Sequence, residues 1–180
     1  MRVIAGQFKG RRLKPPMWDG LRPTSDRLRE TMFNILAPRI AGARVVDGYA
    51  GTGAVGIEAL SRGATHVTFI EQNRRAIALI RENLAACGAD QAHQSYTIEH
   101  GDVAAVLRRS AETFDLVLLD PPYDLHAFRD ALDAAAARLA PDGVIVLERA
   151  SRREPDVPAV LRRVRDVRSG DSTLTFLAHA

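Results

Sequence analysis

The chain has 180 residues, of which 46% are hydrophobic and 26% charged, a composition typical of a globular protein with one substantial core. No apolar run approaches the ~20 residues that a membrane helix needs, and the charged N-terminus lacks the apolar segment of a secretory signal. Cys87 is the only cysteine, which excludes an internal disulfide and a cysteine-based metal site. We therefore expect a cytoplasmic protein with no membrane partner.

The net charge of +3 is unevenly distributed along the chain. Residues 1–44 contain ten Lys or Arg and three acids, and residues 149–168 contain seven Arg and three acids. Residues 45–148, by contrast, contain eight Arg and fifteen acids. Basic flanks on an acidic core indicate a polyanionic partner, most simply nucleic acid. A solvated charged surface without a partner would explain the charge alone equally well.

The N-terminal third predicts a hairpin, a loop and a helix. Residues 2–5 and 11–14 flank a stretch from Gly6 to Gly10 and predict a β-hairpin with a flexible tip. Prolines and a glycine make residues 15–23 a loop, and Thr24 or Ser25 then caps a helix that should end before Pro38. We predict a basic hairpin and loop over residues 1–22 and a main domain over residues 23–180.

From residue 44 onward, apolar runs alternate with helical patterns, which is typical of a mostly parallel sheet. The expected strands are 44–48, 66–71, 95–100, 114–119, 143–148, 161–167 and 172–178, and the expected helices are 54–62, 73–87, 102–110 and 126–139. A tight turn at residues 169–171 makes the last two strands an antiparallel pair. The prediction is a Rossmann-like α/β fold: seven strands, mostly parallel, with an antiparallel edge pair, helices on both faces and the N-terminal β-hairpin.

Residues 45–56 form the stretch around which the chain is organised: Val-Val-Asp-Gly-Tyr-Ala-Gly-Thr-Gly-Ala-Val-Gly. A strand, a glycine loop and a helix in this order are typical of a nucleotide site. The strand ends in Asp47, whose carboxylate would repel pyrophosphate but suits a ligand with a cationic end. S-adenosylmethionine carries an ammonium and a sulfonium and no phosphate, so it is the favoured cofactor, with S-adenosylhomocysteine as its product. A ligand-free tight turn is the plainer interpretation.

Acids follow four successive predicted strands: Asp47, Glu71, Asp102 and Asp120. The carboxyl ends of parallel strands share one edge, where ligands bind. The sequence separation between the glycine loop and Glu71 is typical of a carboxylate that binds ribose hydroxyls. Asp102 either accepts a hydrogen bond from the adenine amino group, caps a helix, or does both. The predicted cofactor-binding residues are Asp47, Tyr49, Ala50, Gly51, Gly53, Glu71, Gln72, Asp102 and Val103.

The sharpest motif is Asp120-Pro121-Pro122-Tyr123, which we predict to be catalytic. The Asp120 carboxylate and the fixed Pro121 carbonyl can accept both hydrogens of an exocyclic amine while its ring stacks on Tyr123. These acceptors favour a pyramidal nitrogen, aim its lone pair at the sulfonium methyl and stabilise the charge that develops. A proline-rich turn without this role is the alternative.

These motifs resemble class I S-adenosylmethionine-dependent methyltransferases that act on exocyclic amines. Four further stretches narrow the resemblance to the RsmD family: Gly10-Arg11-Arg12-Leu13, Leu21-Arg22-Pro23-Thr24, Asp26-Arg27-Leu28-Arg29-Glu30-Thr31-Met32-Phe33-Asn34 and Gly56-Ile57-Glu58-Ala59-Leu60-Ser61-Arg62-Gly63-Ala64. The resemblance implies a class I methyltransferase sheet and methylation of guanine N2 in 16S rRNA of the small ribosomal subunit or its assembly intermediate. Gly48 departs from the large apolar residue usual after the motif's acid, which predicts looser packing beside the cofactor.

A target base inside folded RNA must be unstacked and turned into the pocket. The predicted phosphate contacts are Arg2, Lys9, Arg11, Arg12, Lys14, Arg22, Arg27 and Arg29. We expect no metal, since the five histidines lack the spacing of metal ligands. We also expect a monomer. Deletion of residues 1–14 should leave cofactor binding intact and abolish RNA methylation.

Three other functions stay open at this stage. Methylation of adenine N6 in DNA or RNA would use the same amine chemistry. A non-catalytic rRNA-binding assembly factor could retain the fold. An NAD-dependent oxidoreductase would explain Gly51, Gly53, Gly56 and Glu71, but it leaves the basic hairpin and residues 120–123 without a role.

Overall fold

The computed structural model describes residues 1–18, 26–89, 95–121 and 126–180. Its elements follow one another as α1 (Asp26–Ile40), β1 (Arg44–Gly48), α2 (Ala54–Ser61), β2 (His66–Glu71), α3 (Arg74–Cys87), β3 (Ser95–His100), α4 (Val103–Arg109), β4 (Phe114–Leu119), α5 (His126–Ala136), β5 (Leu139–Ala150), β6 (Leu161–Ser169) and β7 (Ser172–His179). The alternation of strand and helix predicted from residue 44 onward is therefore confirmed.

The strands form a seven-stranded sheet in the order β3-β2-β1-β4-β5-β7-β6. Strands β1 to β5 pair in parallel, whereas β7 pairs antiparallel with both β5 and β6. The predicted mostly parallel sheet with an antiparallel edge pair is thus confirmed. The chain order reverses between β1 and β4, which is where ligands bind in sheets of this kind.

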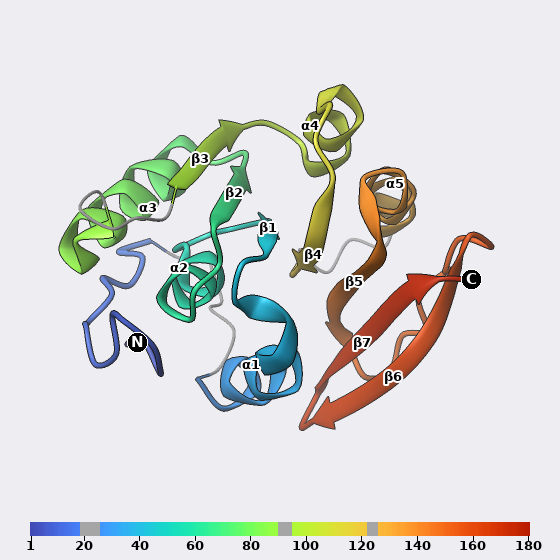
Figure 1. Ribbon diagram of the computed structural model, residues 1–180, viewed down its shortest axis with the longest axis horizontal. Helices are drawn as coiled ribbons and strands as arrows, with labels where there is room; N and C mark the ends of the chain where they lie inside the picture. The colour runs from blue at the N-terminus through green and yellow to red at the C-terminus, as the bar shows by residue number, and fades with distance from the viewer. Residues whose placement is uncertain (19–25, 90–94, 122–125) are drawn as a thin grey trace.

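Helices cover both faces of the sheet (Figure 1), and an apolar cluster of buried side chains lies on each face. One joins the sheet to α1, α2 and α3, and the other joins it to α4 and α5. At the centre, β4 has the sequence Phe-Asp-Leu-Val-Leu-Leu and is buried except at its second residue. A strand covered by helices on both faces needs this nearly continuous apolar run.

Three element boundaries differ from the prediction by three or more residues. Helix α1 continues through Pro38 to Ile40 instead of ending before the proline. Pro38 lies in the last turn and is exposed, so it removes one backbone hydrogen bond there while the buried Leu36 and Ile40 hold the turn against the core. Strand β5 begins at Leu139, where it pairs with Phe114 before a register shift, and α5 correspondingly ends at Ala136.

Residues 1–14, called the N-terminal ribbon below, pair as the sequence predicts, with backbone hydrogen bonds from the Val3 N–H to the Arg11 carbonyl and from the Leu13 N–H to the Met1 carbonyl, but the pairing is too short to form two regular strands. They make one isolated antiparallel bridge, between Arg2 and Arg12. Val3, Phe8 and Leu13 are nevertheless buried in the same cluster as α1 and α2. The ribbon is therefore held mainly by its contacts with the helices, which compensates for the marginal stability of an isolated two-stranded ribbon.

Candidate active site

The candidate site lies where β1 and β4 end side by side. Gly48 and Leu119 are register partners, and the next backbone N–H, that of Asp120, donates to the Gly48 carbonyl over 3.4 Å. The glycine loop leaves β1 at this point and enters α2, and the motif beginning at Asp120 leaves β4. The sheet thus places the predicted cofactor loop beside the predicted catalytic motif.

Carboxylates occupy key backbone N–H groups of the glycine loop. The Gly51 N–H donates to Glu71 Oε2 over 2.8 Å, and the Gly56 N–H donates to Asp47 Oδ2 over 2.8 Å. The Gly53 N–H donates to the Ala50 carbonyl. Gly53 is the N-cap of α2 and has no capping side chain, so Asp47 caps this helix from the neighbouring strand. With these N–H groups already bonded, the loop is poorly suited to cradle a pyrophosphate.

The glycines of this stretch are required for two separate reasons, backbone conformation and close packing. Gly51 and Gly53 have φ of 56° and 76°, in the left-handed region that favours glycine. A Cβ on Gly56 would lie 2.2 Å from Phe69 Cε1, so only glycine allows α2 to approach β2 this closely. The sequence motif indicated that all three glycines matter, and the packing against Phe69 explains why a glycine is needed at Gly56.

The acids at the strand ends are close enough to influence each other electrostatically. Burial raises the pKa of Asp47 well above its ordinary value of 3.8, and the negative charges of Asp120 and Glu71 raise it further, while the Gly56 hydrogen bond lowers it. A cationic ligand would relieve this repulsion, because it adds the opposite charge beside three carboxylates.

Glu71 and Asp102 both have structural partners. Glu71 also accepts from the Asn73 N–H over 2.8 Å, so its two oxygens each hold one backbone amide. Asp102 is the N-cap of α4, accepting from the Ala105 N–H over 2.9 Å and from Gln72 Nε2 over 3.3 Å. The capping role of Asp102 is confirmed. Each carboxylate oxygen retains a second lone pair, which leaves room for a ligand donor.

Tyr49 and Gly48 shape the wall next to this edge. Among the described residues, Tyr49 is the one non-glycine residue with a positive φ, 64°, a conformation that costs about 1–3 kcal/mol and is typical of functional sites. Burial, and secondarily the charge of Asp102, raises the pKa of Tyr49 to about 12, so its hydroxyl stays protonated at neutral pH. A Cβ on Gly48 would meet Leu119 Cδ2 at 2.6 Å and Val103 Cγ1 at 3.4 Å. These side chains already fill the space, and the packing gap predicted for Gly48 is absent among them.

The predicted catalytic motif is described in part. Asp120 is half-buried and Pro121 is buried at the end of β4, whereas Pro122 and Tyr123 lie outside the described residues. The stacking role assigned to Tyr123 therefore stays a prediction.

The predicted RNA-contacting residues fall into three groups. Arg2, Lys9, Arg11, Arg12, Lys14 and Arg27 are exposed, and Arg22 lies outside the described residues. Arg29 is fully buried, so in this structure its guanidinium does not reach a phosphate. Its Nη2 instead donates to the Arg2 carbonyl over 2.6 Å and to Asp26 Oδ1 over 3.1 Å. Burial lowers the pKa of Arg29, and the charges of Asp26 and Glu58 raise it.

Sequence reasoning missed the residues that attach the ribbon to the cofactor loop. The fully buried Glu58 on α2 accepts from the N–H groups of Ile4 and Ala5 over 2.8 and 3.0 Å. Asn83 on α3, also fully buried, accepts from the Lys14 N–H over 2.8 Å and donates to the Thr52 carbonyl over 3.0 Å. The one signal in the sequence was that an acid, Glu58, and an amide, Asn83, stand among apolar residues of predicted helices.

Two arginines of the basic segment 149–168 pair with acids of the same segment. Arg149 is buried, and its Nη2 lies 3.5 Å from Glu154 and 3.2 Å from Asp166. Arg163 pairs with the same two carboxylates. Part of the charge that indicated a polyanionic partner therefore stabilises the end of the sheet.

Comparison with known proteins identifies relatives along nearly the whole chain. Ribosomal RNA small subunit methyltransferase D of Escherichia coli (strain K12) is 42% identical over 123 residues, which are 68% of this chain and 60% of that protein. The Haemophilus influenzae protein of the same name is 35% identical over 165 residues, which are 89% of this chain and 82% of that protein.

Solved structures share the fold. That of yhhF from Escherichia coli, described as a methyltransferase, matches with a TM-score of 0.86 at 30% identity and covers 100% of this chain and 98% of its own. That of TTHA0928 from Thermus thermophilus matches with a TM-score of 0.80 at 28% identity, covering 100% and 99%. The predicted class I methyltransferase architecture is thereby confirmed.

In the part of the chain that the structure describes, no helix has the length and apolar character needed to cross a bilayer. Nor do three or more His, Cys, Asp or Glu side chains come together there as a possible metal site.

The family model described as Conserved hypothetical protein 95 matches residues 1–178, and the chain therefore belongs to that family, the RsmD family whose motifs the sequence resembles.

Proposed function

We propose that this protein transfers a methyl group from S-adenosylmethionine to the exocyclic N2 amine of a guanine in 16S rRNA. The choice of cofactor rests on one observation: the carboxylates of Glu71 and Asp47 already accept hydrogen bonds from backbone N–H groups of the glycine loop. A dinucleotide would need such amides free for its pyrophosphate, whereas a cationic ligand gains from the carboxylates. This charge pattern favours S-adenosylmethionine over NAD.

Bound S-adenosylmethionine supplies an electrophilic methyl group on a sulfonium. Glu71 would hold its ribose hydroxyls, Asp102 its adenine amino group, and Asp47 would keep the loop and α2 in place through the Gly56 N–H. The solved structures and the relatives named as methyltransferases support the use of this cofactor. We take the cofactor-binding residues from the sequence prediction, with Asp47 acting through the backbone that it caps.

Asp120 and Pro121 stand at the end of β4, next to Gly48. We assign the Asp120 carboxylate and the Pro121 carbonyl to the two hydrogens of the target amine. Accepting both hydrogens orients the nitrogen lone pair and stabilises the positive charge that forms on nitrogen. The amine proton then becomes acidic, so no strong base is required. From the sequence motif alone, we assign Tyr123 the role of stacking on the target base and include Pro122 in the catalytic motif.

The substrate assignment rests on the names of relatives at 35% and 42% identity, which are ribosomal RNA small subunit methyltransferases. Six of the eight predicted RNA-contacting cations are exposed, which supports an RNA partner. We further propose that the protein acts as a cytoplasmic monomer on the small subunit or its assembly intermediate. Guanine is favoured over adenine by the family resemblance alone.

The test is transfer of radiolabelled methyl from S-adenosylmethionine to undermethylated small ribosomal subunits, followed by nucleoside analysis. We expect labelled N2-methylguanosine. Labelled N6-methyladenosine would keep the amine mechanism and refute the guanine assignment. Cofactor binding without any label in the RNA would refute the enzymatic function on this substrate and favour an assembly factor.

A further inference from the structure

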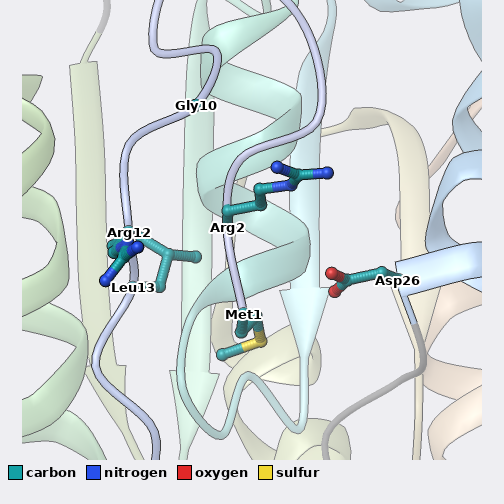
Figure 2. Close-up of a pocket in the computed structure, with 6 residues that line it drawn as sticks. All are labelled: Met1, Arg2, Gly10, Arg12, Leu13 and Asp26. Carbon is teal, nitrogen blue, oxygen red and sulfur yellow. The ribbon is translucent and has the colours of Figure 1, made fainter.

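A polar hollow lies between the N-terminal ribbon and the start of α1. Its lining residue Met1 contacts the glycine loop, since the Met1 sulfur lies 3.9 Å from the Thr52 hydroxyl. The volume of the hollow is about 610 Å³, and it is lined by Met1, Arg2, Gly10, Arg12, Leu13 and Asp26 (Figure 2). This volume falls within the range of about 300–1,000 Å³ that sites for small ligands occupy. This volume is enough for about one nucleotide.

The ribbon directs two cations to one face of the hollow. Arg2 and Arg12 form an antiparallel bridge, flanked by hydrogen bonds from the Val3 N–H to the Arg11 carbonyl and from the Leu13 N–H to the Met1 carbonyl. This is the non-hydrogen-bonded type of pair, in which the Cα atoms lie about 4.5 Å apart and both side chains project from the same face. Val3 and Leu13 are buried, which leaves the two guanidinium groups toward solvent.

These two arginines differ from other cations of the ribbon. Lys14 pairs with Glu82 over 2.9 Å, and Arg11 donates to the Ala86 carbonyl over 3.2 Å. Arg2 and Arg12 have no ion pair or side-chain hydrogen bond among the described residues, although both are exposed. The two side chains leave paired positions of the ribbon, and neither forms an ion pair among the described residues, so both guanidinium groups can turn toward one phosphate.

The opposite wall carries an acid whose position is fixed. Figure 2 shows the side chains of Arg2 and Asp26 directed toward each other across the hollow. The buried Arg29 holds both walls, because its Nη2 donates to the Arg2 carbonyl and to Asp26 Oδ1. This bond compensates the charge of Asp26, whose side chain is 54% exposed and still has acceptor capacity toward the hollow.

We propose that this hollow binds one nucleotide of the substrate RNA, with its phosphate between Arg2 and Arg12 and a sugar or base donor on Asp26. The inference rests on the proposed function and adds to it a site for a nucleotide other than the target. A ribose 2′-hydroxyl suits Asp26, because it can donate to a carboxylate and is absent from DNA. The ribbon thereby gains a specific contact in addition to its diffuse positive charge.

The first test compares two double variants that each remove two positive charges from the ribbon. Arg2→Gln with Arg12→Gln changes the hollow, and Lys9→Gln with Arg11→Gln is the matched control outside it. We would measure the Kd for undermethylated small subunits by filter binding at several salt concentrations, together with cofactor affinity and Tm. The hollow pair should raise this Kd at least tenfold and reduce the salt slope by about 0.7, as expected for one lost phosphate contact. The control pair should raise it less than threefold.

The second test is Asp26→Asn, which keeps an oxygen to accept from Arg29. If Asp26 accepts a hydrogen bond from the RNA, this variant weakens subunit binding severalfold although it removes a negative charge. Tighter binding would overturn the assignment, since it would mean that the carboxylate only repels RNA. Equal losses for the two double variants would likewise overturn the hollow in favour of diffuse attraction. Because binding is measured without turnover, wild-type protein that binds subunits but transfers no methyl would refute the proposed function separately.

Discussion

Removal of residues 1–14 should destabilise the whole protein, because the N-terminal ribbon is part of its core. Val3, Phe8 and Leu13 have exposed fractions of 1%, 3% and 3%. Full burial of one such side chain contributes about 1.5–3 kcal/mol, so the three together contribute about 5–9 kcal/mol as an upper estimate. This is comparable to the 5–15 kcal/mol that stabilises a typical domain.

The truncation also removes hydrogen-bond partners next to the cofactor loop. Asn83 loses the Lys14 backbone, and this same side chain holds the Thr52 carbonyl between Gly51 and Gly53. The sequence predicted that the truncated protein would retain cofactor binding, whereas this packing leads us to expect that it does not. Loss of RNA methylation in such a variant would then reveal nothing specific about RNA contact.

Urea unfolding followed by far-ultraviolet circular dichroism measures this effect directly. We expect the truncated protein either to be unfolded in the absence of urea or to lose most of its free energy of unfolding. A truncated protein within about 2 kcal/mol of the full-length chain and with unchanged cofactor affinity would refute the reasoning. The variant Lys9→Gln, which removes only an exposed charge on the ribbon, is the control and should unfold at the full-length midpoint.

Three further variants test the site. Asp120→Ala should lower kcat for methyl transfer by about 10²–10³-fold, because it removes one preorganised hydrogen-bond acceptor. Asp120→Asn keeps one acceptor and should retain most of the activity. Similar losses of kcat in both variants would contradict the acceptor role. Gly56→Ala should destabilise by about 1–3 kcal/mol in urea unfolding because its Cβ would meet Phe69, and the added change Phe69→Leu should recover part of this. The folded-state pKa of Asp47 lies above its unfolded value, so the native state binds more protons between these two pKa values and stability falls as pH rises through them. Asp47→Asn should therefore gain stability relative to wild type as the pH rises above 3.8, while binding S-adenosylmethionine more weakly. A stability difference that does not change with pH would contradict the burial argument.

The order of strands and helices was predictable because it depends on local periodicity. The alternation from residue 44 onward and the turn at residues 169–171 carry their own signals in the sequence. The ribbon was harder, since its conformation depends on Glu58 and on three buried apolar side chains that dock on distant helices. Pro38 misled the prediction for a related reason: tertiary packing of Ile40 outweighs a weak local helix signal.

The acids of the site were predictable because parallel strands end at one edge, so position in the chain implies position in space. Their hydrogen-bond partners were not. Asp47 and Glu71 each bond a backbone amide of the loop, which requires the distance between strand and loop in three dimensions. Arg29 shows the same limit, because its burial depends on how the ribbon covers α1, and nothing in its own neighbourhood distinguishes it from the exposed Arg27.

The distribution of charge links the two halves of the proposed reaction. Carboxylates gather at the ends of β1, β2 and β4, where a cationic cofactor would bind, and exposed cations gather on the N-terminal ribbon, where RNA would bind. Such opposed surfaces would repel RNA from the cofactor loop unless its backbone were held elsewhere. Asn83 connects the two surfaces through Lys14 and Thr52, so the same buried amide fixes the ribbon and the loop at a set separation. Holding a phosphate on the ribbon would then determine which base of the RNA can reach Asp120.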